Sequence, residues 1–218
     1  MSNGLVESVN VGVPRLVEVD GRTVRTAIWK DPVAGRVPLR GVNLEGDDQA
    51  DRTVHGGPDK AVYAYGLEDT RWWADELYTE LGPGAFGENL TVSGTPVSEA
   101  VIGERWEVGS TLLEIAQPRL PCFKLGIRFG DPTFLRRFAL AGRPGAYLRV
   151  IREGDIGAGD QITVISQPAH GVTSALVART LLGDHDLLER AGQAPELPAD
   201  LRDWVVERAS AHRARGSG

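Results

Sequence analysis

Short apolar runs separated by turn residues fill the chain as far as about residue 170 and indicate a mostly β structure. The candidate strands, several of them rich in β-branched or aromatic residues, are DKAVYAYG, ENLTVSG, RWEVGS, TLLEIAQ, AYLRVIREG and DQITVIS. Residues 5–33 alternate apolar and polar positions around Asp20 and Gly21, a dipeptide that favours a tight hairpin because it tolerates positive φ. We therefore expect the strands that flank this dipeptide to pair.

Two segments inside this β region have helical spacing instead. In residues 66–81, apolar side chains recur at helical intervals behind an acidic pair that suits a helix N-terminus. Residues 131–142 predict a second helix, with Asp131 as its N-cap, Pro132 at its first position and Gly142 as its stop. This second helix would lie just after the segment that holds the single cysteine.

The composition changes near residue 168. Residues 169–218 are rich in helix formers and have breaks near Gly183 and at APELPAD, which predicts three short helices. The expected organisation is therefore a mostly β (α+β) body over residues 1–168, followed by a small helical unit over residues 169–218. Such a unit buries little apolar surface alone, so we expect it to dock on the β body or on a second subunit, as in a homodimer.

Length and charge narrow the classes of partner. The chain has 218 residues, 41% of them hydrophobic, which suits one main domain with a small appendage. Its net charge of -6 opposes general binding to nucleic acid, which needs a basic surface. One cysteine permits no internal disulfide, the N-terminal residues have no signal-peptide pattern, and no apolar run reaches the ~20 residues of a membrane span. We expect a cytoplasmic protein whose partners are small molecules or other proteins.

The single cysteine, Cys122, stands in QPRLPCFKLG between two prolines, with Arg119 and Lys124 on either side. The thiolate is the reactive form of cysteine, and neighbouring cations favour it. A lone cysteine also serves often as a small buried apolar residue. The local sequence leaves both interpretations open.

Two further segments combine glycines with polar residues. In residues 46–66, His55 and Lys60 flank a Gly-Gly-Pro turn and could bind an anionic group, although the local sequence favours a loop with a solvated, charged surface. A zinc site at His55 is rejected because no second histidine or cysteine stands at a suitable spacing. In residues 84–94, a tight bend beside a pocket would explain the glycines, and Asn89 offers a ligand both a donor and an acceptor. An ordinary turn is the alternative.

Arginines gather around one candidate strand within residues 142–162. Arginine suits bidentate recognition of phosphate and other oxyanions. The three arginines are Arg143, Arg149 and Arg152. By the two-residue period of a strand, Arg149 shares a face with Tyr147, whereas Arg152 lies on the opposite face. At most two of the three arginines therefore face one pocket. The segment EGDIGAGD is not followed by a helix, which argues against a nucleotide-binding loop.

Four segments occur in an order that resembles the MOSC domain, named for the C-terminal domain of molybdenum cofactor sulfurases. They are DRTVHGGPDKAVYAY, GAFGENLTVSG, GERWEVGSTLLEIAQPRLPCFKL and GRPGAYLRVIREGDIGAGD. The chain is most similar to the YiiM-type branch, in which the domain stands alone before a three-helix unit, and the resemblance covers essentially the whole chain. It implies a β-barrel-like body with a few helices, in agreement with the strand-rich pattern.

The resemblance also implies a role for the cysteine. The family's invariant cysteine corresponds to Cys122, and in related reductases this cysteine binds molybdenum carried by a pterin cofactor, molybdopterin. Thiolate ligation suits such a metal. The resemblance therefore implies that Cys122 is both the metal ligand and the catalytic residue. The candidate cofactor-binding residues, which lie on matching segments, are His55, Lys60, Asn89, Arg119, Arg143 and Arg149.

YiiM-type proteins are associated with the reduction of N-hydroxylated compounds, including hydroxylaminopurine base analogues. The resemblance thus implies a molybdenum-dependent oxidoreductase that serves in detoxification. Because the chain has no dinucleotide-binding fingerprint, a flavin or iron–sulfur reductase would supply the electrons. Two alternatives stay open: a sulfur carrier with a persulfide on Cys122, and a carrier of the cofactor without catalysis. The chain lacks the pyridoxal-binding domain that full sulfurases use to generate sulfur.

Overall fold

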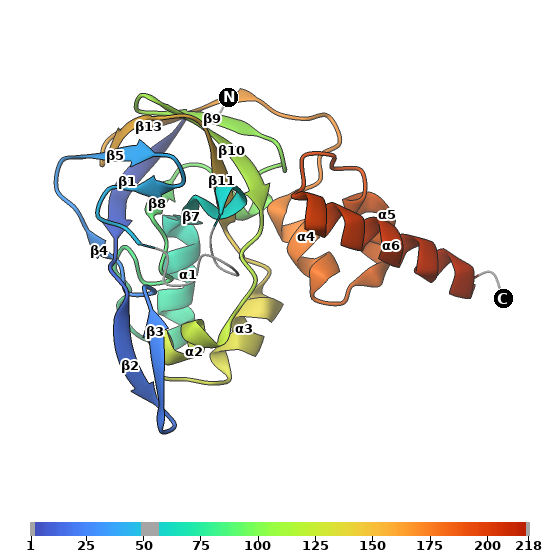
Figure 1. The fold of residues 1–218 in the computed structure, drawn as a ribbon, viewed down its shortest axis with the longest axis horizontal. Coiled ribbons are helices and arrows are strands. Elements are labelled where there is room, and N and C mark those ends of the chain that lie inside the picture. Colours follow the sequence, from blue (N-terminus) through green and yellow to red (C-terminus); the bar gives the residue numbers. More distant parts are fainter. Residues whose placement is uncertain (1–2, 49–56, 217–218) are drawn as a thin grey trace.

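The computed structural model describes residues 3–48 and 57–216, and their strands form a barrel beside a set of helices (Figure 1). The barrel strands are β1 (Asn3–Val11), β7 (Val62–Gly66), β8 (Leu90–Ser93), β9 (Arg105–Val108), β10 (Thr111–Gln117), β11 (Ala146–Arg152) and β13 (Gln161–Ser166). Their order is β13, β9, β10, β11, β7, β8, β1, and the pairing of β1 with β13 closes the barrel. The mostly β class predicted from the alternating pattern is confirmed.

Helix α1 (Leu67–Leu77) connects β7 to β8, the one parallel pair of the barrel as described. The helix predicted over residues 66–81 is thus present, but it ends at Tyr78, which adopts a left-handed conformation with φ 51. Within the barrel, the remaining neighbouring strands are antiparallel.

Two helices follow the cysteine segment where the sequence predicted one. Helix α3 (Phe134–Ala141) ends at Gly142 as predicted, but it begins later than Pro132. Asp131 does not cap it; its carboxylate accepts hydrogen bonds from the backbone N–H and hydroxyl of Thr133, at 2.8 and 2.7 Å, in a turn before the helix. Helix α2 (Phe123–Phe129) was not predicted, because seven residues around a central glycine are too short for a helical period to be recognised.

Smaller sheets attach to the barrel. The predicted hairpin is confirmed: β2 (Arg15–Val19) pairs with β3 (Arg22–Thr26), with positive φ at Asp20 and Gly21, and it projects from the body (Figure 1). The remaining short elements are β4 (Asp31–Pro32), which pairs with β1, the three-stranded sheet of β5 (Arg36–Arg40), β6 (Asn43–Leu44) and β12 (Gly154–Gly157), and the 3-10 turns η1 (Pro58–Lys60) and η2 (Val97–Glu99).

Two clusters of buried side chains hold the body together. Aliphatic residues fill the barrel. A second, largely aromatic cluster lies where α1, α2 and α3 pack on the barrel, and its buried members include Tyr63, Tyr65, Trp73, Phe86, Phe134 and Phe138. Because aromatic side chains bury large areas, this cluster fixes the helices, and with them the segment after β10, against the barrel.

The C-terminal part has three α-helices among the described residues: α4 (Ser174–Leu181), α5 (Leu188–Ala191), which follows the 3-10 turn η3 (His185–Leu187), and the 18-residue α6 (Ala199–Gly216). It contacts the β body, since Ser174 Oγ donates to the Gly145 carbonyl at 2.6 Å and Arg149 donates to the Glu196 carbonyl at 2.8 Å. The expected docking on the body is therefore observed, while α6 extends away from it (Figure 1). In the described residues, no helix is both long and apolar enough to span a bilayer.

Candidate functional site

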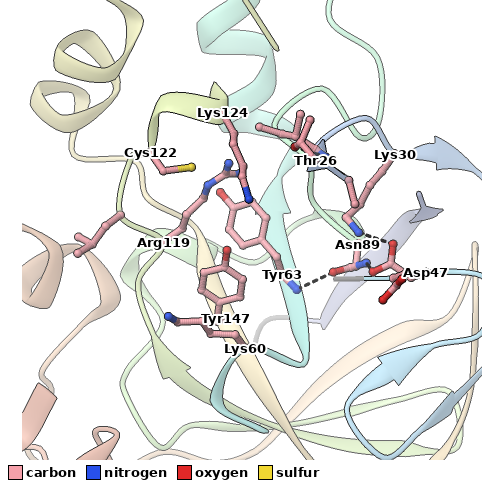
Figure 2. A pocket seen from close by; sticks show the side chains of 15 residues that line it. Thr26, Lys30, Asp47, Lys60, Tyr63, Asn89, Arg119, Cys122, Lys124 and Tyr147 are labelled. Atoms are coloured by element: carbon pink, nitrogen blue, oxygen red, sulfur yellow. Dashed lines mark hydrogen bonds and ion pairs between the residues drawn. The ribbon is translucent and has the colours of Figure 1, made fainter. Parts of the chain in front are cut away.

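A cavity of about 100 Å³ opens between the base of the hairpin, α2 and one end of the barrel (Figure 2). Its lining comes from segments far apart in the sequence: Thr26, Ala27, Ile28, Lys30, Asp47, Asp48, Lys60, Tyr63, Gly87, Asn89, Arg119, Leu120, Cys122, Lys124 and Tyr147. Figure 2 draws these lining residues as sticks and labels Cys122, the two tyrosines, Asn89, Thr26 and the charged residues other than Asp48.

Cys122 is held at the start of α2, where its extended backbone (φ -128, ψ 162) makes it the residue before the first helical one. Two nearby prolines keep the segment between β10 and α2 extended. The side chain is half-buried and lines the cavity together with Arg119 and Lys124. The structure thus places Cys122 in one cavity with the two cations that flank it in the sequence.

Arg119 places a fixed positive charge beside that thiol. Its side chain is buried, with 6% of the residue exposed. It donates a hydrogen bond to the Phe86 carbonyl, and its guanidinium carbon lies 4.9 Å from the centroid of the Tyr63 ring. Burial lowers the pKa of Arg119, but the nearby tyrosines and Cys122 raise it, and the net shift is upward. The guanidinium therefore stays charged and favours a negative charge in the cavity.

Two tyrosines, Tyr63 and Tyr147, also line the cavity, with ring centroids 5.1 Å apart. The Tyr63 hydroxyl donates to the Pro144 carbonyl at 2.9 Å. Burial raises the pKa of Tyr63 and of Tyr147, against the opposing effect of Arg119. Both hydroxyls therefore keep their protons at neutral pH, and Tyr147 presents a neutral proton-bearing side chain to the cavity.

A buried ion pair closes another side. The Asp47 carboxylate accepts hydrogen bonds from the Lys30 ammonium, from the Gly12 N–H at 2.8 Å and from Asn89 Nδ2 at 2.9 Å. Burial lowers the pKa of Lys30, while Asp47 opposes that shift. The Asn89 Oδ1 accepts from the Tyr63 N–H at 3.1 Å, so both ends of this amide are engaged in holding the wall of the cavity.

The loop before β8 has the tight bend that its glycines suggested. Gly84 and Gly87 have φ 78 and 74. A Cβ at Gly87 would lie 2.9 Å from the Ile28 carbonyl, and one at Gly84 would collide with the Lys30 carbonyl. Larger residues would therefore push the cavity-lining segment 28–30 away.

The same loop is organised by a buried carboxylate, Glu88. It accepts hydrogen bonds from the N–H groups of Gly84 and Phe86, at 2.7 and 3.0 Å, and from the Thr91 hydroxyl at 2.8 Å. Burial raises the pKa of Glu88 in spite of these hydrogen bonds. Glu88 does not line the cavity, so its role is to hold the loop that forms part of the cavity wall.

The structure brings some of the predicted site residues together and separates others. Lys60, Asn89, Arg119 and Cys122 line one cavity. His55 lies outside the described residues.

Arg143 and Arg149, also expected to bind a cofactor, do not line this cavity. Arg149 forms ion pairs with Asp59 and, at 2.8 Å, with Glu114. Arg143 pairs with Asp69 and lies over the Trp72 ring. Acidic and aromatic side chains from other elements thus bind both guanidinium groups outside the cavity. Tyr147, on the same strand as Arg149, does line the cavity.

Sequence reasoning missed several lining residues, above all Thr26, Lys30, Asp47 and Tyr63. Lys30 and Asp47 are 17 residues apart and lie on different segments, so only the folded chain brings them together. Each is an ordinary charged residue in a turn-rich stretch, so no local pattern signals the pair.

The chemistry of the lining favours an anionic ligand. Of the described residues around the cavity, Lys30, Lys60, Arg119 and Lys124 are cationic and two are carboxylates, Asp47 and Asp48. Within the described part of the chain, no group of three or more His, Cys, Asp or Glu side chains is placed to hold a metal ion. The thiol of Cys122 is a soft ligand, so these residues fit a metal that arrives with its own anionic organic ligand and takes one further ligand from the protein.

Comparison with known proteins adds family information. The family model described as the MOSC domain matches residues 51–163. The uncharacterized protein YflK of Bacillus subtilis (strain 168) is 38% identical over 168 residues, 77% of this chain and 76% of that protein. The protein YiiM of Escherichia coli (strain K12) is 35% identical over 146 residues, 65% of each chain. A protein named reductase from Gibberella moniliformis is 32% identical over 182 residues, which are 82% of this chain but only 32% of that protein.

Solved structures with the same fold are also known. YiiM from Geobacillus stearothermophilus superimposes with a TM-score of 0.77 and 27% identity, covering 94% of this chain and 98% of that one. YiiM from Escherichia coli has a TM-score of 0.71 and 24% identity, covering 97% of this chain and 94% of that one. Barrel and helices together are therefore a shared architecture.

Proposed function

The chain belongs to the MOSC domain family, as its motifs suggested, and on that premise we propose that it binds a molybdenum–pterin cofactor through Cys122 and reduces N-hydroxylated compounds. The observation that carries this proposal is the cavity itself, in which one thiol stands among four cationic side chains. A single soft ligand and a surplus of positive charge suit a metal bound by a phosphate-bearing pterin.

Different residues of the cavity would bind different parts of this cofactor. Cys122 would ligate the metal, while Lys60 and Lys124 would neutralise the cofactor's negative charge. A cavity of about 100 Å³ is smaller than the ~300 Å³ at which sites for whole cofactors begin, so most of the pterin would remain outside it. When bound, the cofactor would supply the two-electron redox chemistry that no side chain of this protein provides.

The residues of the chain prepare the site for that reaction. Reduction of R–NHOH to R–NH2 breaks the N–O bond, consumes two electrons and two protons, and releases water. Arg119 keeps negative charge favourable at Cys122, which a thiolate ligand requires. Tyr147 holds a proton at its hydroxyl at neutral pH and lines the cavity, so it can deliver one of the two protons.

The electrons would come from a partner protein, a flavin or iron–sulfur reductase, since the sequence has no dinucleotide-binding fingerprint. The Gibberella relative named reductase supports an oxidoreductase class. Because this chain spans only 32% of that relative, the support extends to the class of reaction and not to its substrate.

Molybdenum content tests the proposal directly. Wild type, Cys122→Ala and Cys122→Ser would be produced in cells able to make molybdopterin, and molybdenum and pterin would be measured by elemental analysis and fluorescence. We expect stoichiometric metal in the wild type and none in either variant, with unchanged circular dichroism because Cys122 is only half-buried. Wild-type protein from cells unable to make the cofactor is the control for adventitious metal.

Loaded protein would then be assayed with hydroxylaminopurine and several electron donors. Turnover that requires Cys122 supports the reductase. Metal retained by Cys122→Ala would contradict the assignment, and metal without turnover across the donors would favour a cofactor carrier. A wild type that holds no molybdenum but carries a Cys122-dependent, cyanide-labile sulfur would favour a sulfur carrier.

A further inference from the structure

Two arginines beside the cavity lack the partners that most arginines of this protein have. Within the described part of the chain, neither the Arg15 nor the Arg128 side chain forms a hydrogen bond or an ion pair, and Arg128 Nε is buried without a hydrogen-bond partner. Elsewhere, guanidinium groups are engaged as firmly as Arg36, which contacts Asp160 at 2.7 Å. A buried N–H without a partner costs free energy, so the fold alone does not account for Arg128.

The two arginines also stand close enough to repel one another. Burial lowers the pKa of Arg128, and the charge of Arg15 lowers it further, while Glu88 and Asp31 oppose the shift. Arg15 is fixed in this position because its guanidinium lies 4.1 Å from the centroid of the Trp29 ring. Arg128 occupies the last turn of α2, where a cation suits the helix dipole, but that does not explain a second arginine beside it.

The pair continues the cationic lining of the cavity. On α2, Arg128 follows Lys124 by four residues, so both side chains lie on one face of the helix, and Lys124 lines the cavity. Across from the helix, Arg15 is the register partner of Thr26 in the hairpin, and Thr26 lines the cavity as well. Positive charge therefore extends from the cavity along α2 and the hairpin base to Arg15 and Arg128.

We propose that Arg15 and Arg128 form a second anion-binding subsite, which takes a phosphate or diphosphate group at the end of a ligand that begins in the Cys122 cavity. Guanidinium groups bind phosphate oxygens with pairs of parallel hydrogen bonds, and such a contact would give Arg128 Nε its missing partner. The cavity encloses only part of an extended ligand, which leaves the remainder to reach this subsite. The inference rests on the proposed function for the identity of the ligand, but the subsite itself requires no molybdenum.

Calorimetric titration with inorganic pyrophosphate tests the subsite on full-length protein from cells that make no molybdopterin. We expect Arg15→Gln and Arg128→Gln each to weaken binding about tenfold relative to the wild type. Arg208→Gln is the matched control, because Arg208 also lies over a tryptophan, at 5.2 Å from the Trp204 ring centroid, but in α6. Affinities of both test variants within about twofold of the wild type would overturn the proposal.

Two further measurements separate the sources of the phosphate and the two proposals. If loading with the cofactor blocks pyrophosphate binding, the subsite takes the cofactor's own phosphate. If loaded protein still binds pyrophosphate, with the same dependence on Arg15 and Arg128, the subsite takes a phosphate of the substrate, such as a nucleotide. Cys122→Ala should bind pyrophosphate like the wild type even if it holds no metal. If the protein retained molybdenum but did not bind pyrophosphate, the subsite proposal would be wrong, and the proposed reductase function would be unaffected.

Discussion

Asn89 Nδ2 donates a hydrogen bond of 2.9 Å to Asp47 Oδ2, and this contact joins the residue before β8 to the loop after β6. The same carboxylate holds the Lys30 ammonium and the Gly12 N–H. One side chain therefore ties together the segments that build a wall of the cavity, and the geometry around Cys122 depends on an ion pair far from it in the sequence.

Removing that carboxylate should be costly. In Asp47→Ala, the Lys30 side chain, 9% exposed, would be left buried without its counter-charge. We expect a loss of about 3 kcal/mol in the free energy of unfolding, measured by urea denaturation. Asp155→Ala is the control, because its pair with Arg40 is exposed, and it should cost less than about 1 kcal/mol. Equal losses in the two variants would show that the pair is not buried in solution.

The buried Glu88 should give the protein a distinctive pH dependence. Its pKa is raised from the ordinary value of 4.5, chiefly by burial, so the folded state holds this proton more tightly than the unfolded chain. The stabilisation from the bound proton is complete below pH 4.5 and is lost as the pH rises through the raised pKa of the folded state.

Urea denaturation of wild type and Glu88→Gln between pH about 4 and about 7 would isolate this contribution. We expect the free energy of unfolding of the wild type, minus that of the variant, to fall as the pH rises. A difference that stays constant or rises with pH would mean that the hydrogen bonds from Gly84, Phe86 and Thr91 outweigh burial.

Arg119 should govern the reactivity of Cys122. Removing its charge in Arg119→Gln would take away a cation that favours the thiolate, the form that alkylating reagents attack. We expect iodoacetamide to modify Cys122 about tenfold more slowly than in the wild type at neutral pH. Arg119→Lys keeps the charge and should slow the reaction by less than about threefold. Thermal melting would verify that both variants are folded, and identical rates in all three proteins would exclude this role.

Local signals explain which parts of the fold were predictable. The hairpin depends on Asp20 and Gly21, whose positive φ is a property of the dipeptide itself. Helix α2 depends instead on tertiary packing, because a Cβ at its central Gly126 would meet Leu135 at 3.0 Å and the Asp131 carbonyl at 3.2 Å. That close approach to the start of α3 makes a seven-residue helix stable, and no periodic pattern reveals it.

The residues of the candidate site also differ in whether local sequence could predict their positions. Cys122 and Arg119 were recognisable because a thiol, prolines and cations are adjacent in the sequence. The positions of Arg143 and Arg149 were not, since their acidic partners arrive from other elements. Spacing along one strand predicts which side chains share a face, but it does not say whether a cavity or a carboxylate faces them.

The C-terminal helices should be inseparable from the barrel in stability, although the composition places a boundary near residue 168. Side chains after that boundary belong to the main core: Val172, Val177, Ala194 and Leu197, each no more than 3% exposed. Fully burying a valine or leucine side chain contributes about 1.5–3 kcal/mol, so the joint loss of Val172, Val177 and Leu197 would remove much of the stability of a domain.

A chain ending at residue 168 should therefore melt at least about 10 °C below the full chain or fail to fold, as followed by circular dichroism. In the full chain, Leu197→Ala should cost about 2–4 kcal/mol for the same reason. A chain ending at residue 212 is the control, because it loses the end of α6 with exposed contacts such as those of Arg213 with Glu189 and Ser210, and it should change stability by less than about 1 kcal/mol. If the chain ending at residue 168 melted like the full protein, the barrel would be an independent domain, and the helices would then have to be explained by a partner and not by the core.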